Sequence, residues 1–199
     1  MPIRNTASRW GCASQVLHWL IAALIFIQLP IGLIGAELPP DMEKIAFLAR
    51  HKSIGLTILG LAVIRLAWRS LNPSPPLPGD LKPHERLLAR FSHAALYVLI
   101  IALPLTGWIM SSARGFPISW FNLVQLPDFV GKSKVLYGAM VVTHATLAIG
   151  LIAVLALHVA AALRHHFVLR DDTLRRMLPF ARCEPPLRSD SVATSRPAR

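Results

Sequence analysis

Four long apolar stretches separated by polar connectors dominate the pattern of this chain. They cover about residues 15–35, 51–68, 91–112 and 135–163, and none of them contains Asp or Glu. Each is long enough, as a helix, to cross the roughly 30 Å hydrocarbon core of a bilayer. The pattern therefore predicts an all-α integral membrane four-helix bundle over residues 1–180. The Pro-, Ser- and Arg-rich residues 181–199 are expected to form a disordered basic tail.

The composition supports membrane insertion and a definite orientation. Hydrophobic residues make up 54% of the 199, and the net charge is +11. The 21 Lys and Arg residues lie between the apolar stretches or near their ends, and they divide fifteen to six between the two sides. By the positive-inside rule, both termini are predicted to be cytoplasmic, and the first and third connectors to face the periplasm. Since the basic residues form no single patch with interleaved aromatics, no nucleic acid partner is expected.

Two histidines in the fourth stretch suggest a chemistry for the bundle. His144 and His158 lie 14 residues apart, which is roughly 21 Å along a helix and within roughly 40° around it. One helix would therefore present two imidazoles on one face at two membrane depths. Ionisable groups inside a membrane are usually functional and need partners.

Depth assigns those partners. His51, at the outer end of the second stretch, matches His144, and His18, at the inner end of the first, matches His158. His93, near the inner end of the third stretch, competes with His18. Two imidazole pairs suit two six-coordinate b-type haems, whose iron carries electrons because it has no open position. The haem iron would be the only metal.

Other positions support or compete with this interpretation. Each remaining histidine-bearing stretch has Gly32, Arg65 or Gly107 at the 14-residue step, where a macrocycle face or propionate could be accommodated. His165 is a formal rival of His158, and we disfavour it because the two haems would then be far apart. Cys12 and Cys183 form no CxxC or CxxCH motif, so covalent haem attachment has no support.

Further charged and titratable residues have two interpretations each. Arg65, His93 and His165 are candidates for quinone or propionate contacts, or are ordinary residues of the membrane edge. Arg114, Lys132 and Lys134 would form a positive funnel for a small anion, or are ordinary loop charges. His84 is expected to be a solvated loop residue. The aromatic-rich connector over residues 113–134 suits a segment lying at the membrane interface.

Several motifs resemble one family. They are HWL from His18, HKSIGLTIL from His51, NPSPPLP, HAALYVLIIALPLTGW from His93, SSARGFP, and LHVAAALRHHFVLRDDTLRRMLP near the end. Over about residues 10–180 the chain resembles the bacterial cytochrome b561 family of di-haem inner-membrane cytochromes. The resemblance implies haem ligation by His18, His51, His144 and His158, and ubiquinone as acceptor. The family includes a superoxide oxidase. The loop keeps Arg114–Gly115 but has the small Ser112 and Ala113 before this pair.

The sequence therefore predicts a multi-pass protein of the bacterial inner membrane that carries electrons through two b haems. The expected donor is superoxide at the periplasmic face and the expected acceptor is ubiquinone, which would make the chain an oxidoreductase if it acts alone. One alternative is a membrane-anchor cytochrome that relays electrons between quinone and a partner dehydrogenase or hydrogenase. Another is a haem-free metal-ion transporter that uses the same histidines.

Overall fold

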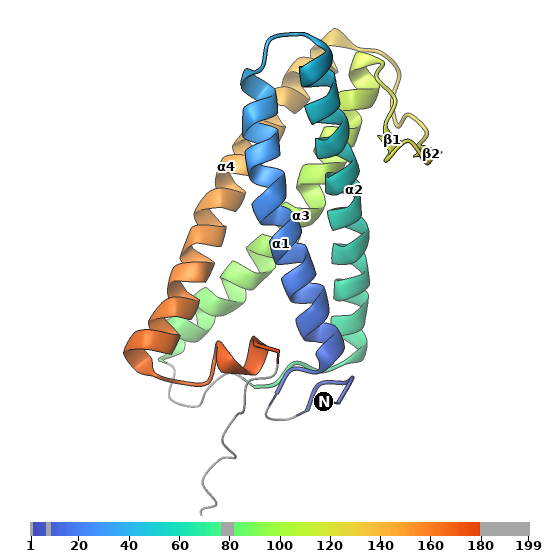
Figure 1. Ribbon diagram of the computed structural model, residues 1–199. Coiled ribbons are helices and arrows are strands. Elements are labelled where there is room, and N and C mark those ends of the chain that lie inside the picture. The colour runs from blue at the N-terminus through green and yellow to red at the C-terminus, as the bar shows by residue number, and fades with distance from the viewer. Residues whose placement is uncertain (1, 7–8, 77–81, 180–199) are drawn as a thin grey trace, which may run out of the picture.

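The fold is a bundle of four long helices, as the sequence predicts (Figure 1). The computed structural model describes residues 2–6, 9–76 and 82–179; the predicted tail over residues 181–199 lies outside this range. The helices are α1 (Cys12–Glu37), α2 (Met42–Leu71), α3 (Pro83–Arg114) and α4 (Lys134–Arg164). Each is long and apolar enough to cross a membrane.

Helices α2 and α3 begin well before the predicted apolar stretches, at polar connector residues that cap them. Asp41 Oδ1 accepts a hydrogen bond from the Lys44 backbone N–H at 3.0 Å, and α2 therefore begins well before residue 51. Glu85 Oε2 accepts from the Lys82 N–H at 3.2 Å at the start of α3. Such caps satisfy N–H groups that have no partner within the helix. Hydrophobicity thus marks the membrane-embedded part of each helix and not its full length.

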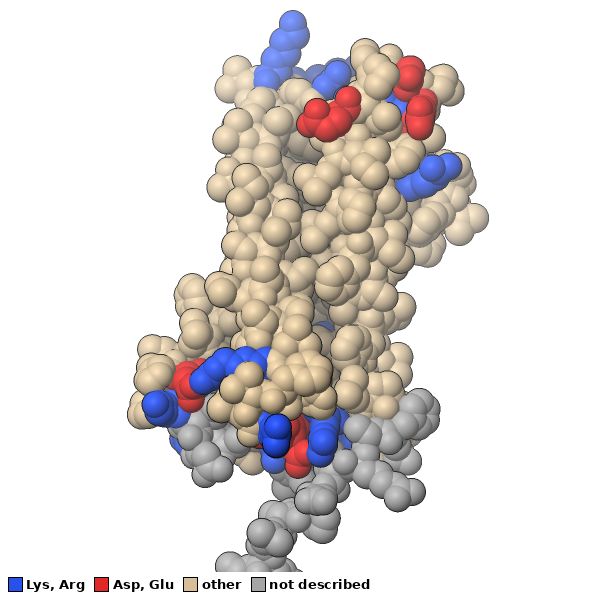
Figure 2. All heavy atoms as spheres, turned by 60° about the vertical axis from the view of Figure 1, so that its left-hand side comes forward, with Lys and Arg blue, Asp and Glu red and all other residues tan. Residues whose placement is uncertain are grey.

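Close helix packing is uneven around the bundle. It is extensive between α3 and α4, α1 and α2, and α2 and α3, but sparse between α4 and either α1 or α2. The buried core is apolar and consists of Ile21, Ile25, Ile58, Ala62, Ile100, Leu103 and Leu151. On the face shown in Figure 2, charged side chains lie at the two ends, and the band between them is almost free of charge. This distribution is the one a bilayer requires.

The connector between α3 and α4 forms a small hairpin that packs against α2. Its strands β1 (Ser119–Trp120) and β2 (Val124–Gln125) pair antiparallel. Trp120 Nε1 donates to Thr57 Oγ1, and the Phe121 backbone N–H donates to Ser53 Oγ, both at 3.0 Å. Several apolar side chains of the connector remain exposed, including Phe116, Phe121, Leu123 and Phe129. Their exposure suits the predicted interfacial segment, although the strands were not expected.

At the opposite end, the chain folds back after α4. A π-helix, η1 (His165–Leu169), is followed by Arg170 at a φ of 55° and by the short 3-10 helix η2 (Arg175–Met177). We call residues 170–179 the inner strap. In Figure 1 it runs from the foot of α4 across to the foot of α1, beside the N-terminal residues. Both ends of the described chain therefore lie at one end of the bundle; that this end is cytoplasmic remains a prediction.

Candidate functional site: two histidine pairs along helix α4

One histidine pair joins α2 to α4. We call it the outer pair, after the side that the sequence predicts for it. The ring centroids of His51 and His144 lie 6.2 Å apart with an interplanar angle of 73°. The Thr106 hydroxyl donates to Leu103 O at 2.8 Å and lies 3.0 Å from His144 Nδ1. Because the Thr106 hydroxyl proton is used in the bond to Leu103 O, Thr106 Oγ1 accepts the hydrogen bond from His144 Nδ1–H. This tautomer leaves Nε2 of His144 free to act as a metal ligand.

Two glycines border the outer pair. A Cβ at Gly32 would lie 2.7 Å from His51 Cε1, and a Cβ at Gly107 would lie 3.3 Å from His144 Cε1. The sequence had placed both glycines at positions where a macrocycle face needs a missing side chain, and both lie directly against the outer imidazoles. His51 Nδ1 is buried without a hydrogen-bond partner among the described residues. Such an atom is costly unless a further group satisfies it.

The inner cluster contains three histidines. The centroids of His18, on α1, and His158, on α4, lie 6.3 Å apart at 68°. His93, on α3, lies 5.5 Å from His158 at 65°. Within the described part of the chain, no hydrogen bond reaches a ring nitrogen of these three residues. Their nitrogens are therefore available to a ligand.

The two separations can be compared with those of metal-bound imidazole pairs. With about 2.0–2.1 Å from nitrogen to metal and about 1.1 Å from nitrogen to ring centre, two axial imidazoles have centroids about 6.3 Å apart. His51–His144 at 6.2 Å and His18–His158 at 6.3 Å match this value, whereas His93–His158 at 5.5 Å is too short. Helix α4 also packs only sparsely on the two helices that supply its partners. The residues present therefore fit a haem at each pair.

Arg65 lies beside the inner cluster and points into the bundle. Its Nη1 donates to Ser14 O at 3.0 Å, and its Nε donates to Tyr97 OH at 3.1 Å. The guanidinium thus bridges α1 and α3, close enough to interact electrostatically with His18, His93 and His158. Whether this half-buried arginine also contacts an anion or a quinone, or serves as a residue of the membrane edge, stays a prediction. Sequence reasoning had not identified Tyr97 as its partner.

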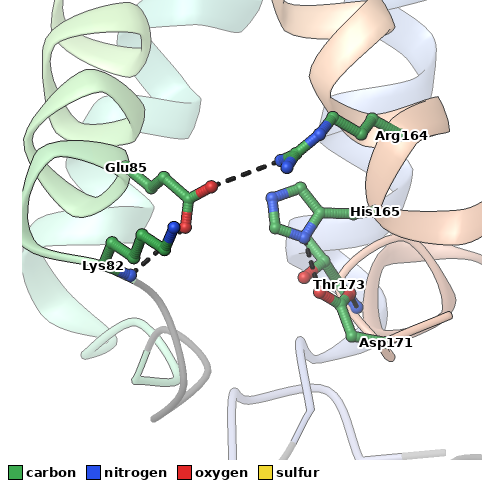
Figure 3. Close-up of polar contacts among 6 residues, drawn as sticks. All are labelled: Lys82, Glu85, Arg164, His165, Asp171 and Thr173. Carbon is green, nitrogen blue, oxygen red and sulfur yellow. Dashed lines mark hydrogen bonds and ion pairs between the residues drawn. The ribbon is translucent and has the colours of Figure 1, made fainter. Parts of the chain in front are cut away.

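His165 pairs with a carboxylate and not with another imidazole. Its Nδ1 lies 2.5 Å from Asp171 Oδ2, and the two side chains are 14% and 26% exposed. Beside them Arg164, on α4, forms an ion pair with Glu85, on α3, at 3.3 Å (Figure 3). Partial burial raises the pKa of Asp171, but hydrogen bonds from Thr173 and His165 outweigh it and leave that pKa below its ordinary value.

The remaining histidine interpretations can now be compared with the structure. His84 is exposed, as expected of a solvated residue, but it lies in the first turn of α3 and not in a loop. Among the described residues, no group of three or more His, Cys, Asp or Glu side chains is arranged to hold a bare metal ion.

Cationic side chains gather at the outer end, where α3 stops. Arg114 Nη1 donates to Tyr137 OH, and its guanidinium lies over the Phe116 and Tyr137 rings, 5.7 and 4.8 Å from their centroids. The Lys132 side chain passes over Gly115, which ends α3 at a φ of 79°. Lys134 begins α4 and is exposed.

Sequence reasoning overlooked one cation at this end. Lys52 follows His51 and donates from Nζ to Ser111 Oγ at 3.2 Å, so it brings a further positive charge from α2 to the end of α3. The sequence alone distinguishes it from none of the other basic residues near the ends of the apolar stretches. Thr106 had been overlooked in the same way, because a threonine in an apolar helix carries no signal of the histidine it faces across the bundle.

The chain is similar to known membrane cytochromes. The family model described as prokaryotic cytochrome b561 matches residues 9–180. "Cytochrome b561 homolog 2" of Escherichia coli (strain K12) is 36% identical over 191 residues, which cover 89% of this chain and 95% of that protein. "Probable superoxide oxidase CybB" of Yersinia pestis is 32% identical over 178 residues, with 87% and 98% covered.

Proposed function

Because the chain belongs to the prokaryotic cytochrome b561 family, and is thus a b-type electron carrier of the bacterial inner membrane, we propose that it holds two b haems. His51 and His144 hold the outer haem, and His18 and His158 hold the inner one. The observation that carries this proposal is the pair of centroid separations, 6.2 and 6.3 Å, on one face of α4. Gly32 and Gly107 have no side chain that would displace the two outer imidazoles packed against them.

The competing ligand His93 takes a different role in this proposal. Its 5.5 Å separation from His158 leaves too little room for a metal between the two rings. Together with Arg65, His93 instead lies beside the inner haem and contacts a haem propionate or the quinone. A haem held by two imidazoles would supply one-electron transfer.

The donor is a small anion at the outer end, and superoxide fits best. The positive side chains of Arg114, Lys132 and Lys134, joined by Lys52, attract anions to the end of α3. Each superoxide gives up one electron and leaves as dioxygen. The similarity to a probable superoxide oxidase supports this choice.

The acceptor is ubiquinone at the inner end. The candidate quinone contacts lie at this inner end, namely Arg65, His93 and His165. The outer and inner histidine pairs, each with one member on α4, would connect the outer end of the bundle to the inner end. A quinone takes up two electrons and two protons to become the quinol, so two superoxide ions are oxidised for each quinone. With both termini cytoplasmic, superoxide reacts on the periplasmic side.

A spectrum of the purified protein tests the proposal. We expect reduced-minus-oxidised bands of b haem, two haems per chain, reduction of both by superoxide, and quinol formation when ubiquinone is added. Protein without haem would contradict the proposal and favour metal-ion transport. Protein with two haems that superoxide does not reduce, but that co-purifies with a peripheral dehydrogenase or hydrogenase, would favour the membrane-anchor role.

A further inference from the structure

A single amide side chain lies deep in the apolar part of α1, against the residue of α2 that begins its apolar stretch. Gln28 is the one polar side chain in residues 20–35. Its Nε2 donates to His51 O at 2.8 Å. An amide in a membrane-spanning segment is costly unless all of its polar atoms have partners, and such residues are usually functional. The place of Gln28 therefore indicates a role beyond one bond between helices.

Two atoms at this contact are buried without partners. Gln28 Oε1 and His51 Nδ1 each lack a hydrogen bond to any described residue. The first is an acceptor, and the second is a donor when the imidazole carries its proton on Nδ1. Buried polar atoms are rarely left unsatisfied. Because the two residues are already joined by the 2.8 Å bond, the unsatisfied donor and acceptor are natural partners of each other.

The His51 ring turns its Nδ1 edge toward α1. A Cβ at Gly32 would lie 2.7 Å from His51 Cε1 and 3.0 Å from Nδ1, but 3.6 Å from Nε2. Gly32 comes four residues after Gln28, and residues four apart lie on one face of a helix. Gln28 and Gly32 therefore border the ring from the same side, and Nε2 is the nitrogen that remains for the outer haem.

The facing imidazole shows what such an acceptor does. His144 Nδ1–H is held by Thr106 Oγ1 at 3.0 Å, because the Thr106 hydroxyl donates to Leu103 O. A bond of this kind fixes the tautomer and the orientation of the ring, and it raises the basicity of the other nitrogen as a metal ligand. On the α1 side, among the described residues, Gln28 Oε1 is the unsatisfied acceptor beside His51.

We propose that Gln28 is a positioning residue for the outer haem, and that its Oε1 accepts the hydrogen bond of His51 Nδ1–H through one buried water. The inference rests on the proposed ligation of that haem by His51. One water with a bond to each atom satisfies both of them. The bond holds the proton on Nδ1 and makes Nε2 a stronger electron donor. Gln28 thereby favours the ferric state and lowers the potential of the outer haem.

The test measures the potential of the outer haem, which a purely structural contact between α1 and α2 would not shift selectively. Redox titration of purified Gln28→Met gives two midpoint potentials, and the wave that is missing from His144→Ala identifies the outer haem. We expect two haems per chain and an unchanged inner potential. The outer potential should rise by about 59 mV, because losing such a partner costs about tenfold or more, and tenfold is 59 mV for one electron.

Two glycines of α2 give matched substitutions that leave Gln28 in place. A Cβ at Gly55 would lie 3.2 Å from Gln28 Nε2, whereas a Cβ at Gly60 would meet no atom within 4 Å. Gly55→Ala displaces the amide and should raise the outer potential by a smaller amount, while Gly60→Ala should leave it unchanged. Gln15→Met removes another amide that donates to a backbone carbonyl, Arg176 O at 3.1 Å, and should not alter the outer potential.

The outcomes separate this role from the alternatives. An unchanged outer potential in Gln28→Met overturns the proposal, and so does an equal shift of both haems, which would reflect a general change of the bundle. If Gln28→Met loses the outer haem altogether, Gly55→Ala decides, and an unchanged outer potential in that variant overturns the proposal. Full haem content in His51→Ala would instead refute the proposed function, since His51 would then hold no haem.

Discussion

Replacing Gly32 with alanine tests the geometry of the outer pair most directly. The new Cβ would lie 2.7 Å from His51 Cε1 and 3.0 Å from its Nδ1. The ring would have to retreat by about 0.7 Å to reach the 3.4 Å at which ordinary contact begins. Metal–nitrogen distances tolerate only about ±0.2 Å. We therefore expect Gly32→Ala to lose the outer haem and keep the inner one.

Alanine substitutions at two other helical glycines serve as controls for this prediction. A Cβ at Gly60 would meet no atom within 4 Å, whereas a Cβ at Gly107 would lie 3.3 Å from His144 Cε1. Gly60→Ala should retain both haems, and alanine by itself favours a helix by about 0.8–1 kcal/mol over glycine. Gly107→Ala requires a retreat of only about a tenth of an ångström, so it should retain both haems with a shifted potential of the outer one.

The assay is haem per chain by pyridine haemochrome, together with redox titration of the purified variants. The expected contents are one haem for Gly32→Ala and two for Gly60→Ala and Gly107→Ala. Two haems with unshifted potentials in Gly32→Ala would refute the assignment of this glycine to the outer site. Loss of the inner haem in place of the outer one would refute the pairing itself.

Three further substitutions and one change of pH test the remaining parts of the molecule. His158→Ala should lose the inner haem while His93→Ala keeps both, as measured by haem content; loss of a haem in the second variant would make His93 the ligand. Lys132→Glu should slow haem reduction by superoxide at least several-fold in stopped flow, with the difference shrinking in high salt; equal rates at low salt would remove the anion funnel. The lowered pKa of Asp171 means that its contribution to strap stability is complete above the ordinary value of 3.8 and is lost as pH falls through the lower folded value. Hydrogen exchange over residues 171–178 should therefore accelerate in acid, and exchange independent of pH, once corrected for the intrinsic rate, would contradict this.

The histidine depths could be predicted from the sequence because they depend on local geometry. A 14-residue step fixes rise and rotation along one helix, and the lengths of the apolar stretches fix the depth of His18, His51, His144 and His158. The structure places His51 beside His144 and His18 beside His158, as the depth argument expected. The four-helix architecture is confirmed in the same way.

The choice between His18 and His93 could not be made from depth alone, since both lie at the inner depth. Depth says nothing about which neighbouring helix faces α4 at the right distance, and only packing gives 6.3 Å for one and 5.5 Å for the other. The inward direction of Arg65 has the same origin, because its contacts with Ser14 and Tyr97 depend on how α2 packs against α1 and α3.

The inner strap shows most clearly the difference between what the sequence determines and what helix packing determines. Its residues were recognisable as a motif, but hydrophobic patterning gives no information about a polar segment that folds back under the bundle. Its course is decided by bonds between residues more than 150 positions apart, such as Trp19 with Met177. The sequence by itself determined the four spans and the depth of each histidine, because both follow from helix periodicity and apolar length. Only the tertiary structure decided which imidazoles face each other and what closes the inner end, because these depend on how the helices rotate and pack.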